Sequence, residues 1–323
     1  MDERHYFNSL KTSWHFVWKY KVLWAFGLLA ATLGQMGVVD FLVKIAKVGT
    51  DDVSIKWLLF PSFLRNGNFG DTLFSSFQSG LVSVILIALL IAIFGFIVFA
   101  ALSSQGAIIH GFAQLMRGRD NVDASSAWHA GVGHAGRLFV LNLVKKVLIF
   151  FSGALVSILV LVNVVDFSVL NFILFLLGFL LACLVGLFAT VLTIYAAGYV
   201  VVEEHGLKDA IENAWRLFIK HWLVSLEIGV VVLCCEILLI FVAIWGIALL
   251  FLPGVLIWLL SLFTFSSTMW IAGSTISIIL STIFVMVLGS IFTVFTTGVW
   301  TYLFMKMHQE GILSRIISVF HRS

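Results

Sequence analysis

ILLIFVAIWGIALLFLPGVLIWLLSLFT, residues 237–264, opens a window at 237–305 that contains no Asp, Glu, Lys or Arg. A helix of roughly 20 apolar residues spans the hydrocarbon of a bilayer, so this window has room for most of two spans. The turn between the two spans is expected near Pro253-Gly254 or within SLFTFSST, residues 261–268. The window therefore predicts a helical hairpin that lies in a membrane.

The rest of the chain has the same apolar character. It is 61% hydrophobic and 11% charged, with a mean hydropathy of +1.12, whereas soluble domains carry about a quarter charged residues. Two further charge-free windows, 72–116 and 167–202, hold one span each. The segments at 22–39 and 147–165 supply two more. The sequence therefore predicts an all-α membrane protein with six transmembrane helices.

The basic residues predict the orientation of these helices. If the N-terminus is cytoplasmic, 15 of the 19 Lys and Arg residues fall on or near the cytoplasmic side and 4 on the other. Such an excess is typical of cytoplasmic loops, so both termini are expected on the cytoplasmic side of a cell membrane, taken here as a bacterial inner membrane. The first apolar run is too long for a signal peptide and is expected to stay as an anchor. The net charge of +3 does not indicate nucleic-acid binding, and membrane lipids are the expected partners.

Motifs that would indicate an enzyme are missing. The sequence has no Walker loop, G-x-S-x-G elbow, H-E-x-x-H pair or C-x-x-C motif. Cys183, Cys234 and Cys235 fall in or beside apolar spans, where thiols pack as small apolar groups. The segment at 40–71, predicted on the outer side, is too short for a catalytic domain of its own. No catalytic residue, metal site or cofactor is therefore predicted.

Three segments correspond when they are aligned on a tryptophan. They read SWHFVWKYKVLW from Ser13, AWHAGVGHAGRL from Ala127 and AWRLFIKHWLVS from Ala214. Each has a small residue, then Trp, then Tyr or His six positions later, and an apolar run follows. A C-terminal fragment, GILSRIISVF from Gly311, parallels GLKDAIENAW from Gly206. The predicted organisation is a single membrane domain, 1–323, with repeats at 1–119 (containing the insertion 40–71), 120–205 and 206–310, and a C-terminal amphipathic helix at 311–323.

Each repeat begins with a predicted amphipathic helix. In residues 207–222, apolar side chains recur every three or four positions and share one side of a helix; they are Leu207, Ile211, Ala214, Trp215, Phe218 and Trp222. Residues 6–18 repeat the pattern, and 122–135 repeat it weakly because two glycines lower its helix propensity. Such helices lie in the headgroup plane. The expected interfacial anchors are Trp14, Trp128, Trp215 and Trp222; chance placement of these tryptophans is the alternative.

One repeat thus combines an interfacial helix, an outgoing span and a returning span. Two spans bring the chain back to the starting side, so the three αα-hairpins would be parallel repeats around an axis along the membrane normal. The predicted architecture is a pseudo-threefold bundle. Small residues at four-residue spacing, as in Gly178, Ala182 and Gly186, are expected to let neighbouring helices approach closely.

Four charged residues near the outgoing spans form a candidate intramembrane polar site. They are Lys145, Lys146, Glu227 and Glu236. Ionisable residues inside a membrane are candidates for transport or proton transfer, and they also form structural ion pairs. If the hydrocarbon begins only near Val147 and Ile237, however, Lys145, Lys146 and Glu236 simply extend to the inner interface. The sequence leaves these three interpretations open.

Four histidines form a candidate cytoplasmic cluster. His110 and His205 lie at the ends of returning spans, and His134 and His221 at the beginnings of outgoing ones. Clustered imidazoles bind metal ions or respond to pH. The alternative is that a histidine at a helix C-terminus interacts favourably with the helix dipole and has no further role.

Two longer segments carry a family resemblance. SSQGAIIHGFAQLMRGRDNVDASSAW (103–128) and YAAGYVVVEEHGLKDAIENAWRLFIKHW (195–222) share a glycine-containing returning helix, a short amphipathic helix and a small residue before Trp. This pattern resembles uncharacterised bacterial six-helix integral membrane proteins and is similar to the membrane domain fused to some glycerophosphodiester phosphodiesterases. The resemblance spans nearly the whole chain and implies an integral membrane module. It transfers no catalytic residue, because the phosphodiesterase chemistry belongs to a separate soluble domain.

Three functions follow from these patterns. The leading hypothesis is a lipid-interacting scaffold or accessory subunit without enzymatic activity, whose interfacial helices hold the cytoplasmic leaflet. The second is a transporter or channel with its path on the pseudo-threefold axis, in which the four charged residues would act. The third is an intramembrane enzyme acting on lipid, which would need the four histidines and Glu227 at one depth.

Overall fold

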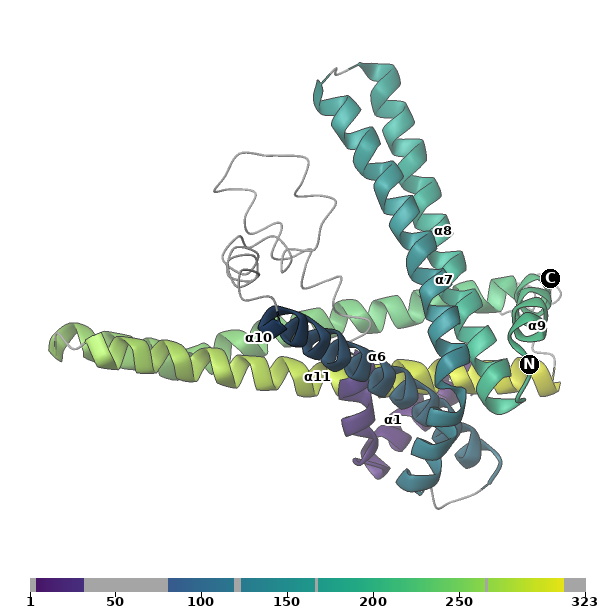
Figure 1. The fold of residues 1–323 in the computed structure, drawn as a ribbon, viewed down its shortest axis with the longest axis horizontal. Coiled ribbons are helices and arrows are strands. Elements are labelled where there is room, and N and C mark those ends of the chain that lie inside the picture. The colour runs from purple at the N-terminus through teal and green to yellow at the C-terminus, as the bar shows by residue number, and fades with distance from the viewer. Residues whose placement is uncertain (1–3, 32–80, 119–122, 166–167, 265–266, 311–323) are drawn as a thin grey trace. The chain divides into compact units, whose positions relative to one another are not determined.

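The computed structural model describes residues 4–31, 81–118, 123–165, 168–264 and 267–310. Within these ranges every regular element is a helix and no strand occurs, so the all-α prediction is confirmed for them. In chain order the helices are α1 (Arg4–Lys19), α6 (Leu81–Met116), α7 (Ala124–Val165), α8 (Val169–Val202), α9 (Leu207–Lys220), α10 (Trp222–Thr264) and α11 (Ser267–Glu310) (Figure 1). A further helical stretch covers residues 23–31.

Five helices of the described part are long and apolar enough to cross a membrane. They are Ile87–Met116, Ala124–Val165, Val169–Val202, Trp222–Ser261 and Thr275–His308. These helices are consistent with a multi-pass membrane protein. Residues 23–31 belong to the span predicted at 22–39, and the remainder of that span lies outside the described residues. The predicted outer insertion (40–71) and C-terminal amphipathic helix (311–323) lie outside them too.

Contacts along the chain define two compact units. Unit 1 contains Met1–Ala31, Ala107–Ala127 and Arg216–Ser323, and unit 2 contains Thr32–Gly106 and Trp128–Trp215. The boundaries between the units fall inside α6, α7 and α9. Each unit is described separately below.

The largest element of unit 1 is the hairpin of α10 and α11, drawn in green and yellow in Figure 1. Its tip lies between Thr264 and Ser267, which is within the predicted turn SLFTFSST. The other predicted position for the turn was wrong, because Pro253 lies inside α10. In an apolar environment the backbone must satisfy its own hydrogen bonds, and this favours continuation of a helix past a proline.

Small residues bring the helices of unit 1 into close contact. Gly254 of α10 lies against Ser277 and the backbone of Gly273 on α11. Gly27, in the helical stretch at 23–31, lies against Ser290 of α11 in the same way. Residues without a large side chain allow such backbone approaches in membrane helices. These contacts fix the 23–31 stretch and α10 on α11.

Helix α1 also belongs to unit 1 and packs on α11. The ring of Phe16 meets the ring of Phe112 edge to face, with centroids 4.8 Å apart. Gly298 of α11 lies against Phe112 and Ser13, where a larger residue would collide with them. The inner side of α1 is therefore part of a protein core.

Unit 2 is organised around the hairpin of α7 and α8. At its tip, the side-chain amide of Asn163 donates to the carbonyl of Asn171 over 2.9 Å, and Ser168 caps the start of α8. Towards the other end of α7, Gly131 lies against Gly106 of α6. The polar contacts thus join α7 and α8 at the tip, and the close backbone contact joins α7 to α6 near the beginning of α7.

Helix α7 differs from the predicted division of the second repeat. The segment at 122–135 and the span at 147–165 were expected as separate elements, yet α7 is continuous from Ala124 to Val165. The intervening residues GRLFVLNLVKK (136–146) include no proline, and one glycine in a helix interior costs only about 1 kcal/mol. The corresponding junctions at Tyr20 and His221 do interrupt the helix.

Burial in the α7–α8 hairpin is confined to one end. No residue is buried in 147–165 of α7 or in 169–188 of α8, which we call the apolar bands of unit 2. The buried residues of α8 all lie from Ala189 onwards. Twenty helical residues span about 30 Å, which is the thickness of the hydrocarbon core of a bilayer. The bands therefore have the length and the exposed apolar surface needed to contact lipid.

Candidate functional site

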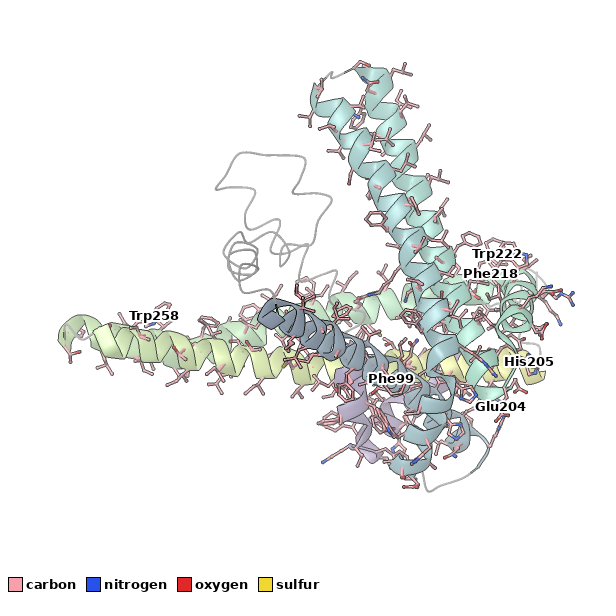
Figure 2. The ribbon with its side chains drawn as sticks, viewed as in Figure 1. Phe99, Glu204, His205, Phe218, Trp222 and Trp258 are labelled. Atoms are coloured by element: carbon pink, nitrogen blue, oxygen red, sulfur yellow. The ribbon has the colours of Figure 1, made fainter. Side chains whose placement is uncertain are left out.

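Helix α9 carries apolar residues on two separate faces. The buried face is formed by Ala210, Ala214, Leu217 and Phe218. The outward face carries Trp215, Ile219 and Trp222, which are 47%, 56% and 52% exposed (Figure 2 labels Phe218 and Trp222). The single apolar stripe predicted from the sequence is therefore divided. Its tryptophans face outward, while its smaller members pack inside the protein.

Helix α1 repeats this division position by position. Its buried face consists of Ser9, Ser13, Phe16 and Val17, which correspond to the four buried residues of α9. Its outward face carries Trp14 and Trp18, which are 53% and 44% exposed and correspond to Trp215 and Ile219. The two helices thus share a burial pattern in addition to the aligned tryptophan.

The beginning of α7 shows part of the same pattern. Ala127, aligned with Ser13 and Ala214, is fully buried, and Gly131 is buried one turn later. Trp128 is partly exposed and Val132 is exposed. We call these three surfaces the outward tryptophan faces: Trp14 and Trp18 on α1, Trp128 and Val132 on α7, and Trp215, Ile219 and Trp222 across α9 and the start of α10.

The four candidate charged residues fall into two pairs. Lys145 and Lys146 lie on α7 in unit 2, and Glu227 and Glu236 lie on α10 in unit 1. Lys146 and Glu236 are exposed, and Lys145 and Glu227 are half-buried. Each unit thus contains two of the four residues, with the same sign of charge. The predicted polar site that would join lysines with glutamates stays a prediction.

An amide side chain on α7, that of Asn142, lies three residues before Lys145 and contacts Gln105 of α6. The Asn142 side chain is 9% exposed and donates one hydrogen bond to Gln105 of α6 over 3.0 Å and another to the carbonyl of Leu138 over 2.9 Å. The sequence pattern did not predict this contact between two helices. The available signal was the presence of single amides, Gln105 and Asn142, in strongly apolar surroundings, but sequence alone does not pair them.

The four candidate histidines are also divided between the units. His110 and His221 belong to unit 1, and His134 and His205 belong to unit 2. His110 contacts Gln114 through its Nε2 atom, and the Nδ1 atom of His134 lies 2.7 Å from the carbonyl of Ala130. Both contacts join a histidine to its own helix at four-residue spacing.

His205 lies in the connection between α8 and α9 (Figure 2). Its ring stacks on Tyr199 with centroids 5.5 Å apart. Its backbone carbonyl accepts a hydrogen bond of 3.2 Å from Arg137 of α7. The preceding residue, Glu204, has a φ of +56°, which is uncommon for a residue with a side chain. These contacts fix the turn that leads into α9.

The described residues do not form a metal site. Among them, no three His, Cys, Asp or Glu side chains come together as a group able to hold a metal ion. Comparison with protein-family models, with curated proteins and with solved structures finds no match to this chain. The structural features that point to a function are therefore the apolar bands and the outward tryptophan faces.

Proposed function

We propose that the chain is a membrane-embedded scaffold or accessory subunit that holds the lipids of the cytoplasmic leaflet. In this proposal, six transmembrane helices form three parallel αα-hairpin repeats around a pseudo-threefold axis, and both termini lie in the cytoplasm of a bacterial cell. Each repeat contributes one interfacial segment. The observation that carries the proposal is the outward tryptophan face at the beginning of each repeat.

The tryptophan faces suit an interface better than water or hydrocarbon. Single exposed apolar residues are common on soluble surfaces, but here they recur at aligned positions, each near a long apolar helix. A tryptophan ring combines a large apolar surface with one N–H donor, and it is enriched where a membrane meets water. On α9, the charged residues Glu212, Arg216 and Lys220 are exposed alongside Trp215. This combination supports contact with headgroups.

The buried faces explain how such helices would hold lipid firmly. A free amphipathic helix binds a membrane reversibly. Helices α1 and α9 instead have a second face that packs inside the protein, with Ser13 and Ala214 fully buried. Their orientation is thereby set before any lipid binds, which reduces the entropy lost on binding.

A transporter is the second candidate, and one observation favours it. Asn142 and Gln105 form a partly buried hydrogen bond between α6 and α7, and half-buried Lys145 follows Asn142 after one helical turn. Polar groups inside a membrane helix bundle often mark a path for ions or solutes. A water-filled path would make proteoliposomes leaky to small ions, whereas a scaffold leaves them sealed.

The leaflet-holding proposal can be tested with two spin labels on α9 of the full chain. Cys183, Cys234 and Cys235 would first be replaced with alanine. Ile219→Cys then places a label on the outward tryptophan face, and Lys220→Cys places a matched label on the charged side of the same helix. In proteoliposomes, we expect the label at 219 to lie about 5–10 Å below the headgroup surface and the label at 220 to lie in water.

Power-saturation electron paramagnetic resonance, with oxygen as the apolar relaxant and a nickel chelate as the polar one, measures these depths. Equal access of the nickel chelate to both positions would show that α9 is surrounded by water, and the proposal would then be wrong. A label at 219 that reports the centre of the bilayer would also contradict it.

A further inference from the structure

The outward face of α1 continues into a chain of three tryptophans. The Trp14 and Trp18 rings meet edge to face at 5.7 Å between centroids, and Trp18 and Trp24 meet in the same way at 5.4 Å. The indole N–H of Trp24 donates to the carbonyl of Val17 over 2.9 Å, which fixes the ring across the turn after α1. We call Trp14, Trp18 and Trp24 the tryptophan chain.

Positive charges alternate with the tryptophan chain along the sequence. Lys11, Lys19 and Lys21 are all exposed. The ammonium of Lys19 lies 5.4 Å from the ring centroid of Tyr20, a cation–π distance that holds this charge beside the turn. No Asp or Glu occurs anywhere in residues 4–31, so the formal charge of this segment is positive.

The aligned segment at α9 has the same shape and a different charge. Its basic residues, Lys208, Arg216 and Lys220, are accompanied by two acidic residues in the same helix, Asp209 and Glu212. The two helices share their buried and outward faces, as described above. Net charge therefore distinguishes the two segments, as do Trp18 and Trp24, which are aligned with Ile219 and Ser225.

We infer that the tryptophan chain and Lys11, Lys19 and Lys21 form a binding site for the headgroup of an anionic phospholipid. The inference rests on the proposed function for the location of α1 at the membrane surface. Lysine ammonium groups donate hydrogen bonds to phosphate oxygens. The tryptophan rings lie against the glycerol and upper acyl region of the same lipid. A free phosphate ion would satisfy the lysines but would leave these rings in water, so a lipid suits the surface better.

The test compares two triple variants of the full chain in proteoliposomes. One is Lys11→Gln, Lys19→Gln and Lys21→Gln; the matched control is Lys208→Gln, Arg216→Gln and Lys220→Gln, which also removes three positive charges. Spin-labelled phosphatidylglycerol and phosphatidylcholine are added separately, and the fraction of each lipid immobilised by the protein is measured. The ratio of the two association constants is the selectivity.

We expect the wild-type protein to prefer phosphatidylglycerol at least about fivefold, which is the factor for a single lysine near the membrane surface that contributes roughly 1 kcal/mol. The α1 variant should lose this preference, and the α9 variant should keep it. Inorganic phosphate at constant ionic strength should leave the selectivity unchanged.

Three results would overturn the inference: an unchanged selectivity in the α1 variant, an equal loss in both variants, or displacement of the lipid by inorganic phosphate. The depth of the label at residue 219 reports separately on the proposed function. If that label lies at the interface and the α1 variant keeps its selectivity, only the headgroup site is wrong. If the label lies in water, the proposed function fails whatever the selectivity is.

Discussion

Replacing Gly27 with leucine should lower the free energy of unfolding by about 3 kcal/mol. A Cβ atom at this position would lie 2.5 Å from the backbone oxygen of Ser290 and 2.7 Å from Cγ2 of Val294. A backbone carbonyl cannot rotate away as a flexible side chain can, so the 23–31 helix must move off α11. The hydrogen bond from the Ser290 hydroxyl to the Trp24 carbonyl would then be lost as well.

The matched control for this variant is Gly95→Leu. Gly95 also lies in an apolar helix, but a Cβ atom there meets nothing within 4 Å. Its unfolding free energy should change by no more than about 0.5 kcal/mol. Unfolding in mixed micelles, followed by loss of helical circular dichroism, measures both variants. Equal stability of the two would mean that the helix at 23–31 does not pack on α11 as described.

Arginine in place of Leu177 should destabilise the membrane-inserted protein by about 2.5–3.5 kcal/mol. Leu177 is 57% exposed near the middle of the α8 apolar band. On a water-facing surface, exchanging an exposed leucine for arginine has little effect on stability. In hydrocarbon the guanidinium must be desolvated or must draw water into the bilayer. The size of the effect therefore reports what surrounds the band.

Val169→Arg is the control, because Val169 is 74% exposed at the first residue of the same helix. An arginine at a helix end reaches the interface with its charged group, so this variant should remain close to wild type. Resistance to alkaline extraction from membranes, together with unfolding in bicelles, compares the two. Similar behaviour of both variants would indicate that the α8 band does not lie in hydrocarbon.

The long apolar helices could be predicted from the sequence because their cause is local. A charge-free window such as 167–202 favours lipid as its surroundings. In lipid, a helix satisfies the hydrogen bonds of the backbone N–H and C=O groups within the segment itself. The turn within SLFTFSST was also predictable as one of two positions. The choice between it and Pro253 was not, because a proline in lipid interrupts a helix less than its propensity in water suggests.

The faces of the short helices were predictable only in part. Hydrophobic periodicity located the apolar side of α9 but did not separate Trp215, which faces outward, from Phe218, which is buried. Both residues are apolar, so only tertiary packing distinguishes them. The Asn142–Gln105 contact was not predictable for a similar reason, since its partners lie on different helices. The candidate charged and histidine clusters each combine residues from both units, and they stay predictions.

We expect the three segments that begin the repeats to lie on one side of the membrane. His15, His129 and Arg216 each follow the aligned tryptophan of one segment, and all three are exposed. In the cysteine-free full chain, His15→Cys, His129→Cys and Arg216→Cys would be treated with a membrane-impermeant maleimide in sealed vesicles of each orientation. We expect all three positions to react from the cytoplasmic side only. Reaction of positions 129 and 216 from opposite sides would contradict the placement of these segments on one side of the membrane.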